Sequence, residues 1–377
     1  MNAGLAALLF LSLCGGLARA EESSREPLER RVARMLLVGT RGFEVVPGGD
    51  FERFVCGMGI GGVLLFDRDP SGAGASHNIR DRAQLKTLTA ELQELARRCG
   101  DAPLLIAADV EGGKVNRLAP VEGLERLKSA AWLGRRPPRR TYDEGLRIAD
   151  TMRATGINWN LAPVIDVNLN PENPVIGKLG RSFSTDPDSV AAHADAFIRS
   201  HRDRGVLSCV KHFPGHGSSD RDSHKGAVDV SVTANLRVEL APYESLIEAG
   251  LVDCVMPGHL YNRQVDSERM MTVSTAAIRG LLRERLGYTG LVLSDDLQMG
   301  AVKSAMSLGE AAVEAVLAGV DMLTLSFSRA NASRGSAKTV HAALIAAVRE
   351  GRLSEARIDE ANRRILELKS RLEEARP

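Results

Sequence analysis

The feature that most constrains the fold of this 377-residue chain is a series of short apolar, β-branched runs at fairly even intervals. Runs of this kind are typical of strands buried on both faces. Stretches with helical periodicity separate most of them, including 82–98, 189–204 and 308–318. Buried strands that alternate with amphipathic helices predict a parallel sheet. The eight runs are 35–39, 62–66, 104–109, 158–166, 206–212, 254–259, 291–295 and 321–326.

Eight such runs favour an α/β fold closed into a single (β/α)8 TIM-type barrel over an open doubly wound sheet. A barrel with long βα loops accommodates the whole length as one domain, and no Pro- or Gly-rich linker divides the chain. Two long loops are expected, at 111–142 and 168–188. The helical stretch 355–374 is amphipathic, so we expect it to pack outside the barrel or to cap it.

The first 20 residues differ from the rest of the chain. An apolar run at 5–13 is followed by Ala18-Arg19-Ala20, a small-x-small cleavage site. This pattern predicts a signal peptide at 1–20 and a mature domain at 21–377, although no Lys or Arg precedes the apolar run. Lipidation at Cys14 is disfavoured by Leu13 before it. We expect a periplasmic or secreted protein, or a cytoplasmic one if the signal peptide is absent.

The charge balance excludes several kinds of partner. The chain has 49 basic and 48 acidic residues, and removal of 1–20 takes away one Arg and no acid, which leaves 48 of each. No strong field therefore directs the protein to nucleic acid or to an anionic membrane. No second apolar stretch of about 18 residues occurs, so stable membrane insertion is not expected. We expect a monomer.

A glycine pattern at 57–62 matches the dinucleotide-binding sequence GxGxxG. It precedes a predicted strand, whereas the dinucleotide motif follows a strand and opens a helix. We interpret it as a turn and expect no cofactor.

Four cysteines follow the predicted signal peptide, and none has the CxxC spacing of a zinc site. Cys209 and Cys254 lie in apolar runs and are expected to be buried free thiols. Cys56 and Cys99 each precede a predicted strand. A disulfide between these two is a hypothesis.

Polar residues end several of the apolar runs. In a parallel barrel the βα loops open on one face, so these residues are expected to meet there. They are Asp109, Lys211, His212, His259, Asp295 and Asp296.

The segment 211–224 concentrates titratable groups. His212 and His216 have the i,i+4 spacing of a helical metal site, but Pro214 and Gly215 between them are incompatible with a helix. No metal is therefore expected. Asp222 and His224 are better suited to proton transfer, because a carboxylate on one imidazole nitrogen raises the basicity of the other.

Asp295 ends the run Leu291-Val292-Leu293-Ser294, where a carboxylate faces the mouth of a barrel and suits a nucleophile. Asp296 is expected to point elsewhere or to begin the following helix. Geometry alone does not decide between the two.

The chain resembles glycoside hydrolase family 3, most closely its β-N-acetylglucosaminidase branch. The resemblance lies in Lys-His-Phe-Pro-Gly-His-Gly from position 211, Asp-Ser-His from 222, Asp-Val-Glu-Gly-Gly from 109, Gly-Arg-Ser-Phe from 180 and Ser-Asp-Asp from 294. These motifs follow the order of the family and cover residues 30–370.

The resemblance implies a retaining double displacement. Asp295 matches the nucleophile, and His224 with its partner Asp222 matches the general acid–base, which departs from the two-carboxylate scheme of most glycosidases. His259 has no firm role. The positions that match residues holding the sugar hydroxyls and the N-acetyl group are Asp109, Arg117, Arg181, Lys211 and His212.

The resemblance further implies exo-hydrolysis of terminal β-linked GlcNAc from peptidoglycan fragments or chitin oligomers. β-Glucosidases of the family usually take their acid–base from a second α/β domain, and this chain ends after the predicted barrel, which favours the hexosaminidase branch. Recycling enzymes of this branch are usually cytosolic, so the predicted export favours trimming outside the cytoplasm.

Three alternatives stay open. A phosphorylase on the same fold would form a sugar 1-phosphate in phosphate buffer, and a His acid–base does not repel phosphate. A noncatalytic peptidoglycan-binding protein would bind without turnover. A metallohydrolase would lose activity on chelation.

Overall fold

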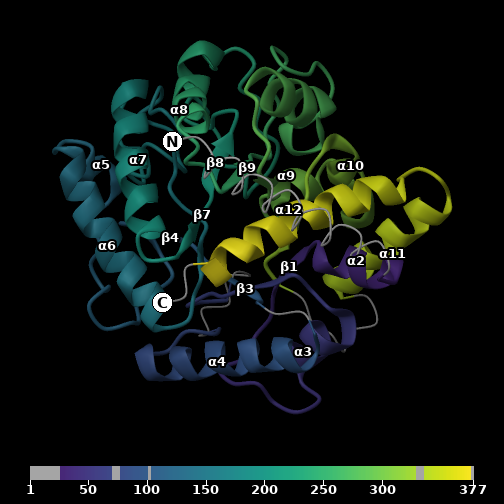
Figure 1. Cartoon of the computed structure of the whole chain (residues 1–377). Helices are drawn as coiled ribbons and strands as arrows, with labels where there is room; N and C mark the ends of the chain where they lie inside the picture. The colour runs from purple at the N-terminus through teal and green to yellow at the C-terminus, as the bar shows by residue number, and fades with distance from the viewer. Residues whose placement is uncertain (1–25, 70–76, 101–102, 328–334, 375–377) are drawn as a thin grey trace, which may run out of the picture.

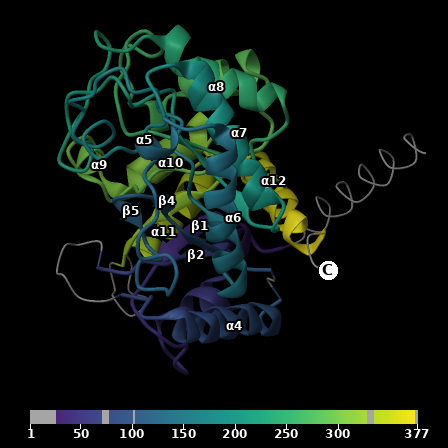
Figure 2. The same ribbon diagram turned by 90° about the vertical axis from the view of Figure 1, so that its left-hand side faces the viewer.

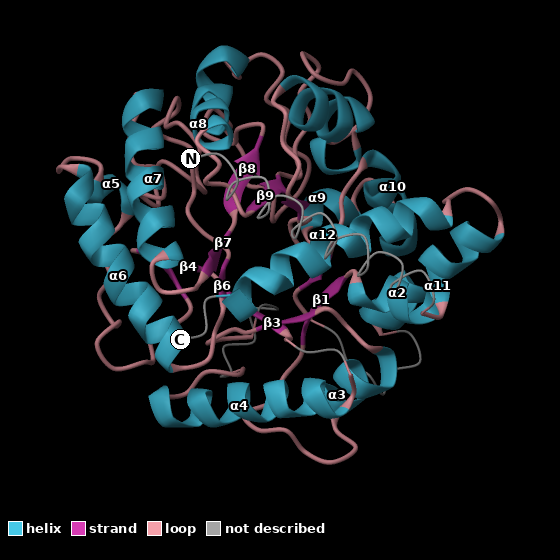
Figure 3. Ribbon diagram, in the orientation of Figure 1, coloured by secondary structure: helices cyan, strands magenta, loops and turns pink. Residues whose placement is uncertain are grey.

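The computed structural model describes residues 26–69, 77–100, 103–327 and 335–374. The predicted signal peptide at 1–20 lies outside these residues. Parallel strands occupy the centre of the molecule, and helices surround them (Figure 1 and Figure 3). No described helix combines the length and the apolar character that crossing a membrane requires.

The strands form a six-stranded sheet in the order β11-β1-β2-β3-β6-β7 and a three-stranded sheet in the order β10-β9-β8. Every pair in these two sheets is parallel. Isolated parallel bridges join Val164 to Lys211 and Leu293 to Met322, between the two sheets. The strands are β1 (Leu36–Gly39), β2 (Gly62–Leu64), β3 (Leu105–Ala108), β6 (Trp159–Asn160), β7 (Leu207–Ser208), β8 (Val210–Phe213), β9 (Cys254–Pro257), β10 (Leu291–Val292) and β11 (Leu323–Leu325).

Each predicted run contains a strand, and the run 206–212 contains β7 and most of β8. The α/β fold with a parallel sheet is therefore confirmed. All residues of these strands are buried, and helices pack around the strands (Figure 3).

The helices follow the expected alternation. Those packed around the strands are α2 (Leu28–Arg34), α4 (Arg82–Arg98), α6 (Pro138–Ala154), α7 (Pro187–Arg202), α8 (Leu236–Glu248), a π-helix (Ala276–Arg285), α10 (Leu308–Ala318) and α11 (Ser336–Arg349). Shorter ones are α3 (Asp50–Glu52), a π-helix (Arg53–Met58), α5 (Ala130–Leu133), a 3-10 turn (Met271–Val273) and α9 (Gly300–Lys303).

Helix α4 shows why these segments are helical. The Asp81 side chain accepts a hydrogen bond from the backbone of Gln84 and caps the amino end. Leu85, Leu88, Leu92 and Leu95, at helical spacing, form its buried face. The helix has the bounds predicted from this pattern.

Helix α12 (Glu355–Glu374) lies across one end of the strands, opposite the loops that carry α5 and α9 (Figure 1 and Figure 2). Its Arg357 and Arg364 contact Asp321, which precedes β11. Its Arg371 contacts Asp253, which precedes β9. Helix α12 therefore caps the amino ends of the strands, as expected.

The prediction of a long loop at 111–142 is wrong for much of this segment. Its first residues form the hairpin β4 (Val110–Gly112) and β5 (Val115–Asn116), and α5 follows. The Ser129 side chain caps α5, and Pro138 opens α6, a position that proline favours because its fixed φ suits a first turn.

Both cysteine pairs are disulfide-bonded. The Cys56–Cys99 bond confirms the hypothesis. The expectation of free thiols at Cys209 and Cys254 is wrong, because these two also form a disulfide. The reason is strand register: Val210 pairs with Val255, so the preceding cysteines face each other across neighbouring strands with a Cα–Cα distance of 4.4 Å.

Candidate active site

Four charged side chains form a cluster at the carboxyl ends of β3 and β8, here called the Lys211 cluster: Asp109, Glu111, Arg181 and Lys211. The Lys211 Nζ atom lies 2.7 Å from Asp109 Oδ1 and 2.8 Å from Glu111 Oε1. Arg181 holds Glu111 with both ends of its guanidinium, Nε to Oε2 at 2.7 Å and Nη2 to Oε1 at 2.8 Å. Such bidentate pairing fixes geometry as well as charge.

The Lys211 cluster is largely buried, but part of it is accessible to solvent. Burial opposes ionisation of Glu111, yet the charges of Arg181 and Lys211 outweigh it and hold the pKa of Glu111 well below its usual range. Both oxygens of Glu111 are engaged, whereas the Asp109 side chain is 18% exposed. Asp109 and Lys211 therefore keep hydrogen-bonding capacity for a ligand.

Asp166, which follows β6, organises the residues after Lys211. Its Oδ1 accepts from the backbone N–H groups of His212 (3.1 Å) and His216 (2.8 Å), and its Oδ2 lies 2.8 Å from His212 Nδ1. Burial opposes ionisation of Asp166, but His212 outweighs it and lowers its pKa. An ionised Asp166 makes Nδ1 of His212 the donor, and Nε2 of His212 has no hydrogen-bond partner among the described residues.

His216 extends this network toward the next loop. Its Nδ1 lies 2.7 Å from Ser219 Oγ and its Nε2 lies 3.2 Å from Ser223 Oγ. Gly217 permits a close approach to the loop after β6, since a Cβ there would lie 1.7 Å from the Val167 carbonyl oxygen. Contacts with Asp166, Val167 and the following serines thus fix the segment 211–219 in place.

Asp222 and His224 lie on the loop between β8 and α8. Asp222 Oδ1 accepts from the backbone N–H of His224 at 2.9 Å and lies 2.8 Å from its Nδ1. The His224 side chain is 62% exposed, so its Nε2 is open to a substrate. The backbone N–H groups of Gly300 and Ala301 donate to the carbonyls of His224 and Ser223 at 3.2 and 3.1 Å, which tethers this loop to α9.

Asp295 follows β10, in the same connection that leads to α9. Burial opposes its ionisation, but His259, His212 and His224 outweigh it and lower the pKa of Asp295 to about 2. The carboxylate is therefore ionised at neutral pH, and its charge acts on the imidazoles of His212 in β8, His224 in the loop after β8 and His259 after β9. The charge of His224 thus acts on Asp295, and the loop of the Asp222–His224 pair is tethered to α9, which follows Asp295.

Asp296, the neighbour of Asp295, is held by backbone N–H groups. Its Oδ1 accepts from the backbone of Gln298 and Ser326 at 3.0 and 3.1 Å. His259 has both ring nitrogens engaged, with Thr272 Oγ1 at 2.8 Å and the Asp296 carbonyl at 3.0 Å. His259 thus supports the Asp295–Asp296 turn.

Arg117 is placed differently from the other predicted binding residues. Its backbone N–H donates to the Asp109 carbonyl at 3.0 Å. Its guanidinium lies over the Phe66 ring and 3.5 Å from Asp67 Oδ1.

Among the described residues, no group of three or more His, Cys, Asp or Glu side chains has the arrangement of a metal site. The two histidines that suggested one, His212 and His216, each direct Nδ1 to a partner within the protein, Asp166 and Ser219.

Sequence reasoning missed two residues. Asp166 ends the predicted run 158–166, so the strand-end criterion that singled out Asp109 and Asp295 applies to it equally. Glu111 lies two residues after Asp109 in a quoted motif, but its pairing with Arg181 spans 70 residues and leaves no local signal.

Comparison with known proteins identifies the family to which this fold and site belong. Residues 28–368 match the model of the glycosyl hydrolase family 3 N-terminal domain. The chain is 35% identical to a β-hexosaminidase of Thiobacillus denitrificans over 275 residues, which cover 70% of each chain. It is 31% identical to β-hexosaminidase A of Pseudoalteromonas piscicida over 337 residues, 83% of this chain and 54% of that protein.

Solved structures give the same result. A family 3 β-N-acetylglucosaminidase from Paenibacillus sp. str. FPU-7 superposes with a TM-score of 0.83 at 37% identity, over 92% of this chain and 63% of that one. LpqI of Mycobacterium tuberculosis superposes with a TM-score of 0.79 at 30% identity, over 93% and 96%. The chain thus spans little more than half of some relatives and nearly all of others. It belongs to glycosyl hydrolase family 3.

Proposed function

We propose that this protein is a retaining exo-β-N-acetylglucosaminidase. The observation that carries the proposal is the meeting of an ionised Asp295 with the Asp222–His224 pair, whose loop is tethered to α9 just beyond Asp295. One group suits attack on an anomeric carbon, and the other suits proton transfer to the leaving oxygen.

The reaction has two steps. A carboxylate oxygen of Asp295 attacks the anomeric carbon, the glycosidic C–O bond breaks, and His224 Nε2 gives its proton to the departing oxygen. His224 then takes a proton from water, the water oxygen attacks the same carbon, and the bond to Asp295 breaks. Asp222 accepts from His224 Nδ1–H throughout and stabilises the imidazolium. Two inversions give net retention.

The binding residues act by position. Asp109 accepts from sugar hydroxyls, as does the Nε2 atom of His212, whose Nδ1 donates to Asp166, while Lys211 and Arg181 supply donors and positive charge. Arg181 acts mainly by fixing Glu111, which in turn places Lys211. Arg117, with its guanidinium beside Asp67, serves the rim of the site.

We further propose that the strands close into a (β/α)8 barrel. Its support is the pair of isolated bridges, one on each side of the β10-β9-β8 sheet. In such a barrel every group named above lies at the carboxyl ends of the strands, the face that carries catalysis in this architecture.

The proposed location is the periplasm or the exterior, with 1–20 as signal peptide and 21–377 as the catalytic domain. Its support is the presence of two disulfides, which persist in oxidising compartments. Peptidoglycan fragments or chitin oligomers are then the accessible polymers that contain β-linked GlcNAc.

The direct test is hydrolysis of an aryl β-GlcNAc followed by proton NMR of the released sugar. We expect β-GlcNAc as the first product, and the α anomer first would contradict the double displacement. GlcNAc–anhydro-muramic acid and chitobiose, compared on the mature protein, identify the aglycone.

The same preparation separates the alternatives. Sugar 1-phosphate in phosphate buffer would identify a phosphorylase, binding without turnover a noncatalytic protein, and loss of activity on chelation a metalloenzyme. We expect free GlcNAc, with no effect of a chelator.

A further inference from the structure

Glu239, a buried carboxyl group in the first turn of α8, lies directly beneath the segment 211–219. Its residue is 1% exposed. A Cβ at Gly215 would lie 2.6 Å from Glu239 Cβ and 2.7 Å from its Cδ, so the Gly215 backbone rests on this side chain. The proposed mechanism gives Glu239 no part.

The surroundings of Glu239 do not suit a carboxylate. Its Oε1 has no hydrogen-bond partner among the described residues, nor has the hydroxyl of Tyr243 one turn further along α8. The Tyr243 ring packs edge-on against Phe213, at 5.2 Å between centroids. A buried oxygen without a partner costs much less when the group is neutral.

The charged group that faces Glu239 from the adjacent connection is Asp166, and it is negative. Burial raises the pKa of Glu239 to about 7, Ser218 and the Asn235 backbone oppose this, and Asp166 adds to it. His216 supplies no compensating charge, because burial, with His212 next, lowers its pKa to about 4.

We propose that Glu239 is a positioning residue. Its protonated carboxyl packs against the segment 211–219 and keeps that segment hydrogen-bonded to Asp166. Deprotonation of Glu239 disturbs this arrangement. A second carboxylate beside Asp166 would repel the charge that His212 and His216 both depend on. The disturbance reaches the sugar pocket through His212 and the acid–base loop through the His216–Ser223 contact. The catalytic part of this inference rests on the proposed function.

The first test measures stability and needs no activity. It compares Glu239→Gln, which resembles the protonated form, with Glu244→Gln on the same helix, whose side chain is 49% exposed. Because the folded pKa of Glu239 is raised, the wild type loses stability between the unfolded pKa near 4.5 and pH 7, and the Gln variant does not.

The expected result is that the Tm of Glu239→Gln minus that of the wild type rises by several degrees from pH 5 to pH 8. The same difference for Glu244→Gln stays flat. A flat difference for Glu239→Gln would overturn the proposal that this carboxyl is held protonated.

The second test separates positioning from mere structure. The hydrogen-bonded Nδ1–H proton of His212 is followed by NMR from pH 6 to 9, with assignment by its loss in His212→Gln. We expect it to shift or broaden above about pH 7 in the wild type and to stay unchanged in Glu239→Gln.

Activity supplies a third readout. An aryl β-GlcNAc with a highly activated leaving group removes the dependence on His224 as acid. The alkaline limb of kcat/KM is expected to move to higher pH in Glu239→Gln and not in Glu244→Gln. If neither this limb nor the His212 signal responds, the positioning role is wrong. If the wild type does not hydrolyse the substrate, the proposed function fails while the NMR and stability tests still decide the role of Glu239.

Discussion

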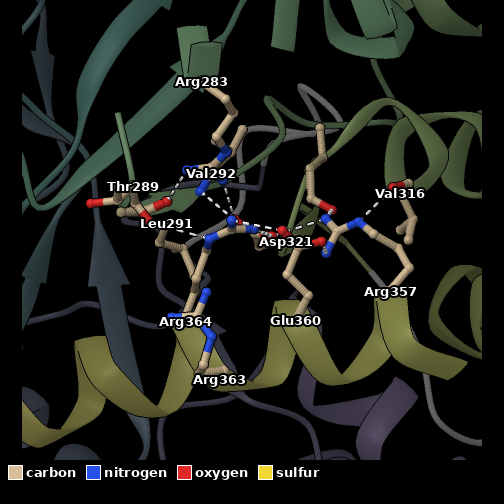
Figure 4. A network of polar contacts seen from close by, with 12 residues as sticks. Arg283, Thr289, Leu291, Val292, Val316, Asp321, Arg357, Glu360, Arg363 and Arg364 are labelled. Atoms are coloured by element: carbon tan, nitrogen blue, oxygen red, sulfur yellow. Dashed lines mark hydrogen bonds and ion pairs between the residues drawn. The ribbon is translucent and has the colours of Figure 1, made fainter. Parts of the chain in front are cut away.

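The Lys211 cluster and the charged cluster around Asp321 lie at opposite ends of the parallel strands. They differ in how much of the hydrogen-bonding capacity of their carboxylates is used within the protein. Asp321 is fully buried and accepts from Arg283 (2.8 Å), Arg357 (2.9 Å), Arg364 (3.0 Å) and the Val292 backbone (3.0 Å) (Figure 4). All lone pairs of this carboxylate are used. Asp109, in the other cluster, accepts from Lys211 Nζ at 2.7 Å, and its side chain is 18% exposed.

The difference shows what distinguishes a binding cluster from a structural one. Both contain buried carboxylates paired with arginine. At the amino ends of the strands the pairing ties α12 and a π-helix to β11 and leaves nothing for a ligand (Figure 4). At the carboxyl ends it fixes Glu111 and, through Glu111, Lys211, while Asp109 keeps an exposed edge for a ligand.

The largest expected effect is at the carboxyl ends. Asp295→Asn removes the nucleophile, so kcat/KM for an aryl β-GlcNAc should fall by about 10⁴-fold or more. The variant should fold normally by circular dichroism, because an Asn side-chain oxygen can still accept the hydrogen bond that Asp295 Oδ1 accepts from the Asp296 backbone at 2.7 Å. Turnover near that of the wild type would show that the nucleophile is another group.

Asp321→Asn tests the stabilising role of the charged cluster at the amino ends of the strands. It leaves three arginines without their shared charge, so the free energy of unfolding should fall by about 3–5 kcal/mol. Urea titration measures this loss. The kcat/KM of the folded fraction should stay within about twofold, and a much larger drop would mean that the two ends are coupled.

His224→Ala should reduce kcat/KM by about 100-fold for a substrate with a poor leaving group and less for an activated one. Asp222→Asn should have a smaller effect in the same direction, because it removes only the partner of Nδ1. Equal losses for both kinds of leaving group would argue against His224 as the acid.

The smallest effect is a pH dependence of stability from Glu111. Its folded pKa is lowered, so its contribution is present above the unfolded value near 4.5 and is lost as pH falls below it. Urea midpoints of the wild type should therefore decline more steeply from pH 6 to pH 3 than those of Glu111→Gln. Parallel declines would mean that Glu111 is not held ionised.

The sequence predicts the helices and strands well because the spacing of apolar residues is a local property of the chain. The bounds of α4, α10 and α12 follow from apolar spacing and capping residues alone. Strand ends point to Asp109, Lys211 and Asp295 for the same reason.

What depends on register or distant pairing is not predictable in this way. The Cys209–Cys254 bond follows from the alignment of β8 with β9, and the Glu111–Arg181 pair joins residues 70 positions apart. The support of His212 by Asp166 similarly needs the neighbouring connection in place.

The cap formed by α12 has a consequence for biosynthesis. Residues near 360 hold residues near 31: Asn362 donates to the Arg31 carbonyl and accepts from Arg34, and Arg31 pairs with Asp359. Strand β1 likewise acquires one of its two neighbours only when β11 arrives. A chain emerging from a ribosome or a translocation pore therefore keeps an open β-edge until β11 at 323–325 has emerged, and over that interval it is exposed to aggregation and needs a chaperone more than the finished protein does.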